Sequence, residues 1–179
     1  MKKNPATILL TMLLCLAMLL PAAGAAAETK SIFMPDYIVD LYNEAVPAFW
    51  KTFLKSEIPD NYKEEFTLKF DSQEEDRIYY TNSSSTLLVM FRASDRNSKA
   101  TEIYFWNSLR NDIRNLPQIV FGWVAVQNKL EGSDKANGMN LMEWLNEDVE
   151  DGATLEYADF NAIRNEKAHV FSSFTLTTK

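Results

Sequence analysis

The chain contains very few of the residues that usually carry catalytic or metal chemistry. Its 179 residues include one cysteine, one histidine and five glycines. The cysteine, Cys15, lies in an N-terminal segment that we expect to be removed, so the mature chain would have none. Disulfides, zinc thiolates and thiol nucleophiles are then excluded, and the stability of the mature protein must come from packing alone.

The scarcity of glycine excludes the known phosphate-binding loops. Such loops need glycines at fixed spacing so that backbone amides can approach the phosphate. The glycines that follow residue 27 are widely scattered and match neither glycine-rich nucleotide fingerprint: Gly122, Gly132, Gly138 and Gly152. The sequence therefore predicts no nucleotide cofactor.

The single histidine is a weak candidate for catalysis. His169 lies on a predicted strand, with Ser172 and Ser173 close by in the sequence. A Ser–His pair needs a third group and an oxyanion site, and the Gly-x-Ser-x-Gly turn that exposes a nucleophilic serine is absent. We interpret His169 as a histidine on a strand surface.

Two acidic clusters are candidate cation sites, residues 74–76 and residues 147–151. Calcium loops place several carboxylates around a glycine-containing turn. Starting from Asp148, the expected ligand positions hold Glu150 and Gly152, which breaks the EF-hand pattern at its third ligand. We predict no metal site here, and interpret the clusters as solvated loops and helix ends. Carboxylates could also act as the acid and base of a glycosidase, although the sequence gives no distance between them.

The N-terminus has the three parts of a secretory signal peptide. Lys2 and Lys3 are followed by an apolar stretch at residues 8–20 and small residues at 22–27. The apolar stretch is too short to span a membrane, and cleavage after Ala27 satisfies the A-x-A preference. Lipidation is not favoured, because Cys15 lies inside the apolar stretch rather than at its end.

We therefore expect a secreted or periplasmic protein without a stable membrane anchor, with a signal peptide at 1–27 and one domain at 28–179. Loss of Lys2 and Lys3 takes the formal charge from −7 to −9, since residues 1–27 contain no acidic side chain. This acidic balance disfavours nucleic acid and anionic lipid as partners. The short basic start suggests a bacterial origin, so we interpret the glycosylation sequon at Asn82 as chance.

Apolar periodicity predicts helices in two parts of the chain. The first begins at Asp36 and extends to Phe53, with Pro47 producing a kink or dividing it into two short helices. A polar connection follows at 55–65. A longer helix is favoured over 108–130, with a bend at Pro117, although residues 118–126 could also form a buried strand. A short helix is expected at 139–149, and the tryptophans of these helices are expected in the core: Trp50, Trp123 and Trp144.

Alternating patterns predict strands in the centre and at the end of the chain. They cover residues 66–70, 77–81, 86–93, 100–106, 154–163 and 168–177, with the last two joined by a turn at 164–167. The predicted class is α+β, a mainly antiparallel sheet of about five to six strands with N-terminal and central helices. The expected order is one helix, four strands, two helices and two strands.

The strands at 86–93 and 100–106 are apolar on both faces, which predicts a central position in the sheet. One set of alternating residues is Leu87, Val89, Phe91, Ile103 and Phe105; the other is Leu88, Met90, Tyr104 and Trp106. The predicted helices cannot cover both faces, and an uncovered apolar face on a soluble protein usually marks an interface. We expect the second set to be the less covered one and to form an interface, although the sequence leaves the register between the strands open.

These absences and this face favour a non-enzymatic exported domain that binds a protein partner or a second copy of itself. The alternative is an exported hydrolase that uses carboxylates as acid and base. A carboxylate pair in a cleft would favour the hydrolase, and a flat apolar patch would favour binding.

The signal-peptide interpretation predicts a mature N-terminus at or near Glu28. Mass spectrometry of the periplasmic or extracellular fraction should detect a chain that lacks the first 27 residues. Recovery of a membrane-held chain that still begins at Met1 would contradict it.

Overall fold

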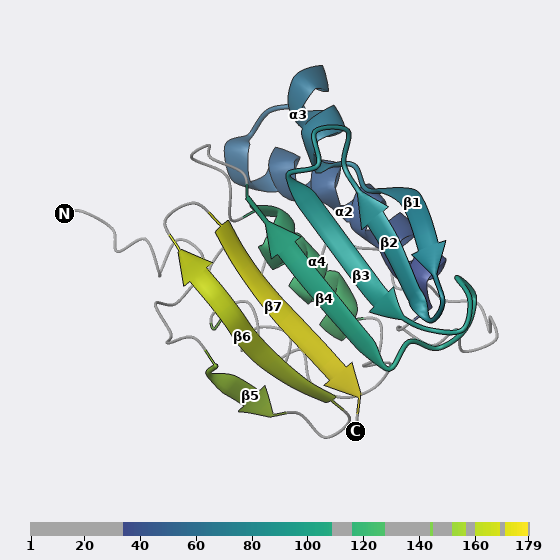
Figure 1. Cartoon of the computed structure of the whole chain (residues 1–179). Coiled ribbons are helices and arrows are strands. Elements are labelled where there is room, and N and C mark those ends of the chain that lie inside the picture. Colours follow the sequence, from purple (N-terminus) through teal and green to yellow (C-terminus); the bar gives the residue numbers. More distant parts are fainter. Residues whose placement is uncertain are drawn as a thin grey trace, which may run out of the picture.

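The computed structural model describes residues 34–108, 116–127, 144, 152–156, 160–168 and 171–178. These residues form three helices and one seven-stranded sheet in which every strand pair is antiparallel (Figure 1). The predicted α+β class is confirmed. The sheet has seven strands rather than five to six, and the order of elements differs from the expected one.

The first described helix, α2 (Pro35–Leu54), begins with a proline, whose fixed φ suits the first turn and whose missing N–H is not needed there. It ends where Lys55 adopts a left-handed φ of 56°. Pro47 lies inside this single helix, so a division into two short helices does not occur. A further short helix, α3 (Asp60–Phe66), occupies most of the segment predicted to be a polar connection. It forms because Phe66, at its end, is completely buried in the core.

The stretch that could have been helix or strand is a helix, α4 (Leu116–Gln127). Its residues 117–125 are all buried, so the helix is apolar on every side. A segment of this kind has no polar face, and its sequence pattern therefore resembles that of a buried strand. Pro117 is the second residue of α4, and residues 109–115 and 128–130 of the longer predicted helix lie outside the described residues, so the predicted bend is not tested. The helix predicted at 139–149 lies outside the described residues except for Trp144, which is helical. Trp144 is buried, as are Trp50 and Trp123.

The strands are β1 (Lys69–Glu74), β2 (Arg77–Thr81), β3 (Leu87–Arg92), β4 (Glu102–Asn107), β5 (Thr154–Glu156), β6 (Phe160–Ala168) and β7 (Phe171–Thr178). Across the sheet they lie in the order β1-β2-β3-β4-β7-β6-β5. The strands predicted at 77–81, 86–93 and 100–106 are confirmed as β2, β3 and β4. The strand predicted at 66–70 begins later, and the one predicted at 154–163 is divided between β5 and β6.

The turn predicted at residues 164–167 is wrong, because these residues belong to β6. Arg164 is completely buried, its Nη2 donates to the carbonyl of Trp144 at 2.9 Å, and its guanidinium lies 5.1 Å from the Trp144 ring. The backbone of Arg164 also bonds to Gly152 and Ala153. Charged residues are almost never buried unless paired, so the sequence pattern placed Arg164 at the surface.

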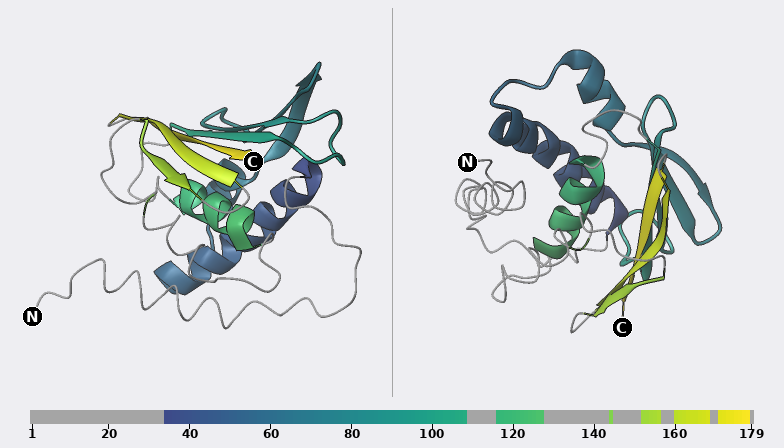
Figure 2. Two further views of the ribbon diagram at one scale, coloured as in Figure 1. Left: turned by 90° about the horizontal axis from the view of Figure 1, so that it is seen from below. Right: turned by 90° about the vertical axis from the view of Figure 1, so that its left-hand side faces the viewer.

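The core lies between one face of the sheet and the two longer helices (Figure 2). Phe121 of α4 is at its centre, with ring centroids 5.0 Å from Phe105, 6.4 Å from Phe91 and 5.7 Å from Tyr42 of α2. Phe121 therefore contacts two strands and the neighbouring helix at once. Both α2 and α4 lie on this side of the sheet, as the two views of Figure 2 show.

The β2–β3 turn is held by the buried side chain of Asn82. Its Nδ2 donates to the carbonyl of Glu65 at 2.6 Å and to the hydroxyls of Ser84 and Thr86, and its Oδ1 accepts from the amides of Thr86 and Leu87. Asn82 is only 2 % exposed, so the amide nitrogen of the sequon is already engaged in the folded protein.

Replacing Asn82 with alanine should lower the free energy of unfolding by about 2–4 kcal/mol, because buried backbone groups lose their partners. The matched control is Ser83→Ala in the same turn, where the side chain is exposed and the expected change is below about 0.5 kcal/mol. Urea unfolding followed by circular dichroism would measure both. Equal small effects would show that Asn82 does not hold the turn.

Candidate functional site

Alternation divides β3 and β4 into one covered and one exposed set of side chains. Leu87, Val89, Phe91, Ile103 and Phe105 are all 0 % exposed and face the helices. Leu88, Met90, Tyr104 and Trp106 point to the other side and are partly exposed. None of the described helices lies on that side of the sheet (Figure 2). We call it the open face.

The register of β3 and β4 brings the four predicted interface residues together. Leu88 lies directly opposite Trp106, and Met90 lies directly opposite Tyr104. Cross-strand neighbours on one face have Cβ atoms about 5 Å apart, so these four side chains form a continuous apolar patch. Tyr79 of β2 lies opposite Met90 and extends the patch by one strand.

One end of the open face is charged. A single row across the first four strands pairs Glu74 with Arg77, Arg77 with Arg92, and Arg92 with Glu102. This row has two charges of each sign. The turn between β1 and β2 adds Asp76, whose Oδ2 lies 3.7 Å from Nε of Arg92, an ion pair that remains partly exposed to solvent.

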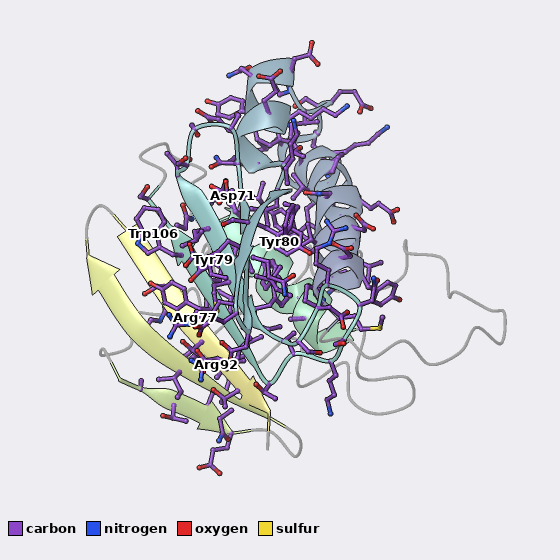
Figure 3. All side chains as sticks on the ribbon, turned by 45° about the vertical axis from the view of Figure 1, so that its right-hand side comes forward. Asp71, Arg77, Tyr79, Tyr80, Arg92 and Trp106 are labelled. Carbon is purple, nitrogen blue, oxygen red and sulfur yellow. The ribbon has the colours of Figure 1, made fainter. Side chains whose placement is uncertain are left out.

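Figure 3 shows how these side chains are distributed over the two sides of the sheet. The labelled Trp106, Tyr79, Arg77 and Arg92 belong to neighbouring strands and mark the open face, whereas Tyr80 lies on the opposite side toward α2. Tyr79, Arg77, Arg92 and Glu102 were not among the predicted site residues. Their signal was in the sequence, because they continue the alternation that places Met90 and Tyr104 outward, but without a register they could not be joined to that group.

Neither edge of the sheet is suited to pairing with another strand. At one edge, β1 is mostly exposed and is irregular between Phe70 and Ser72, which leaves Asp71 outside the regular register. At the other edge, β5 has only three residues. Bulges, exposed charges and short strands are the usual features that prevent edge pairing. The two edges are therefore disfavoured as places for a further strand to pair.

A separate polar cluster lies on the helix side, between the N-terminus of α2 and the sheet. Tyr80 donates its hydroxyl to Oδ1 of Asp36 at 2.5 Å, and Arg96 lies 3.5 Å from the other oxygen. The guanidinium of Arg96 stacks 4.6 Å above the Phe70 ring. Burial, and then the hydrogen bond to Asp36, raise the pKa of Tyr80 well above its ordinary value. The phenol is thus a neutral donor, and the two carboxylate oxygens of Asp36 connect α2 to β2 through Tyr80 and to the loop after β3 through Arg96.

The other chemical candidates fall in different places. His169, Asp148 and Glu150 lie outside the described residues, and Gly152 has a left-handed φ of 82°. The cluster at 74–76 includes the β1–β2 turn. Within the described part of the chain, no group of three or more histidine, cysteine or acidic side chains could hold a metal ion.

Ser173 is buried on the open face, directly across from Trp106.

None of the helices in the described ranges is long and apolar enough to cross a membrane.

No protein-family model matches the chain, and comparisons with curated proteins and with solved structures give no match. The class of protein is therefore argued from the site alone.

Two buried phenols predict a loss of stability at high pH. Burial raises the pKa of Tyr42 and contributes most to the raised pKa of Tyr80. A group whose pKa is higher in the folded state stabilises the fold fully below its unfolded pKa, about 10 for tyrosine, and loses that contribution as pH rises further. Urea unfolding between pH 8 and pH 11 should therefore show a falling free energy above about pH 10.

The variant Tyr42→Phe separates the two phenols. The Tyr42 hydroxyl is buried without a hydrogen-bond partner among the described residues, so its removal should cost less than about 1 kcal/mol at pH 7. The same variant should reduce the slope above pH 10. An unchanged slope in Tyr42→Phe would show that this phenol is accessible to solvent.

Proposed function

We propose that the protein is an exported, non-enzymatic binding domain that recognises another protein molecule through the open face. The observation that carries this proposal is the continuous patch of Leu88, Met90, Tyr104 and Trp106 on the side of the sheet that no described helix covers. Apolar patches of this kind on monomeric proteins usually mark interaction sites.

The composition of the open face supports protein recognition. Tryptophan, tyrosine, methionine and arginine are the residue types enriched at the centres of protein interfaces, where a few of them contribute most of the binding energy. Trp106, Tyr104 and Met90 lie within the patch, and Arg92 lies next to it. Antiparallel pairing also presents them on a rigid surface, which lowers the entropic cost of binding.

The alternative hydrolase is less well supported by the described carboxylates. The two oxygens of Asp36 are engaged by Tyr80 and Arg96. Glu74 and Glu102 lie at the ends of the charged row, with two arginines between them. An acid–base pair needs a proton donor and acceptor on either side of a substrate, and these carboxylates are not paired with one another.

Trp106→Ala should weaken binding by about 2 kcal/mol or more, roughly 30-fold in Kd, because a central tryptophan is the most common energetic anchor. Its cost to the free energy of unfolding should be smaller than that of Phe105→Ala, about 3–5 kcal/mol, since Phe105 is completely buried. Binding can be followed by photo-cross-linking from position 104 in the native cell envelope, and stability by urea unfolding.

The control for the cross-linking is Leu54, which is 44 % exposed at the end of α2 and distant from the open face. A cross-linker placed there should give no adduct that depends on Trp106. If Trp106→Ala unfolds the protein as strongly as Phe105→Ala, or leaves every adduct from position 104 unchanged, the proposed function is wrong.

A further inference from the structure

We infer that the occupant of the open face is a second copy of this chain, packed sheet against sheet about a two-fold axis that runs approximately along β3 and β4 and midway between them. This inference rests on the proposed function and specifies the partner. It follows from the order of side chains along the two central strands, and from the distribution of charge in the row that crosses them.

The two central strands present complementary residues at the same levels. Along β3 the open face has Leu88, Met90 and Arg92, and along β4 it has their cross-strand partners Trp106, Tyr104 and Glu102. A two-fold axis midway between the strands exchanges β3 of one copy with β4 of the other. Each residue then faces the copy of its own cross-strand partner, as an isologous interface requires.

This exchange forms two identical charge pairs. Arg92 of each copy faces Glu102 of the other, while Leu88 faces Trp106 and Met90 faces Tyr104. Arg77 lies beside Arg92 on the neighbouring strand, so in the dimer it is one strand away from Glu102 of the other copy. Opposite charges that meet across an interface fix its register, and like charges at the same position oppose it.

Other two-fold axes within the same face are disfavoured. An axis along β3 would place Arg92 against its own copy, and an axis along β4 would do the same to Glu102. An axis perpendicular to the strands would exchange the charged end with the apolar end and set Arg92 against Leu88. Burying a charge against an apolar side chain is costly, so the axis between β3 and β4 is selected.

The charge of the open face fits a copy better than a strongly charged partner. Glu74, Arg77, Arg92 and Glu102 sum to zero, and Glu156 at the β5 end of the same row brings the total to −1, so both signs are present although the whole chain is acidic. A partner selected by long-range attraction would meet a face with an excess of one sign.

The area of the open face sets the strength expected of the dimer. Neighbouring strands lie about 4.8 Å apart, and each strand rises about 3.3 Å per residue. The five adjacent strands β2, β3, β4, β7 and β6 therefore give this part of the open face a flat area of about 500 Å². Standard interfaces bury about 800 Å² per partner, so we expect a weak dimer that forms at micromolar concentration. Face-to-face sheets cross at about −30°, so the axis is inclined by about half that angle to β3 and β4, and the three central residue pairs stay close to it.

The test is a reciprocal charge exchange at the two residues that face each other across the axis. Sedimentation velocity of the purified protein over a range from about 1 to 500 µM should show a monomer–dimer equilibrium. Arg92→Glu alone and Glu102→Arg alone should each weaken the dimer at least 10-fold, because each creates two like-charge pairs. The double variant, with both changes, should recover a Kd within about 3-fold of the original.

The matched control is Glu64→Arg, the same change of charge on an exposed position of α3, which should leave the Kd unaltered. Circular dichroism of each variant at a concentration where it is monomeric verifies folding. A protein that stays monomeric throughout the range, or a double variant that fails to recover, would overturn the inference.

The outcome is separable from the proposed function. A monomeric protein that still gives Trp106-dependent cross-links from position 104 to a different protein refutes the copy as occupant and leaves binding by the open face intact. If neither self-association nor any cross-link responds to Trp106→Ala, both conclusions fail.

Discussion

The packing of α4 against the centre of the sheet, through Phe121, is the contact on which the other features of the molecule depend. Its ring meets Phe91 and Phe105 from adjacent strands and Tyr42 from α2. Because side chains alternate along a strand, the face that receives Phe121 becomes the core and the neighbouring positions must point outward. The open face is a direct consequence of where α4 binds.

Polar side chains then hold the ends of this arrangement in place. Asp36 connects the start of α2 to Tyr80 and Arg96, and Asn82 closes the turn between β2 and β3. Two turns further along α2, the amide of Asn43 both donates to and accepts from the backbone of Leu68, at 2.9 Å each. The two asparagines satisfy backbone groups that regular structure leaves unpaired, and together with Asp36 they fix the helices relative to the strands.

Because the described helices pack on one side of the sheet, apolar side chains on the other side remain partly exposed to solvent. β3 and β4 are apolar on both faces, as strands covered on both sides usually are, yet the described helices cover one face only. The side chains of the open face shield one another in part, since Trp106 and Met90 are neither buried nor fully exposed. Binding of a second molecule would remove the remaining apolar surface from water, which is the physical reason to expect an interface there.

Much of the secondary structure could be predicted, because local patterns determine it. The alternation of β2, β3 and β4 and the helical repeat of α2 and α4 depend on residues close in sequence. The predictions were wrong where a long-range contact overrides the pattern. The polar run at residues 164–167 favours a turn, but Trp144 provides a carbonyl and a ring that make a buried strand position acceptable for Arg164.

In the candidate site, too, local sequence pattern determines some features and long-range contacts determine the others. The sequence alone determined that Leu88 and Met90 share one side of their strand and that Tyr104 and Trp106 share one side of theirs, because the side-chain period of a strand is two. Only the tertiary structure decided that these two sides are the same face, that Tyr79, Arg77, Arg92 and Glu102 complete it, and that α2 and α4 cover the opposite face. Register and helix placement depend on contacts between residues far apart in the chain, and a single sequence does not contain that information in its local pattern.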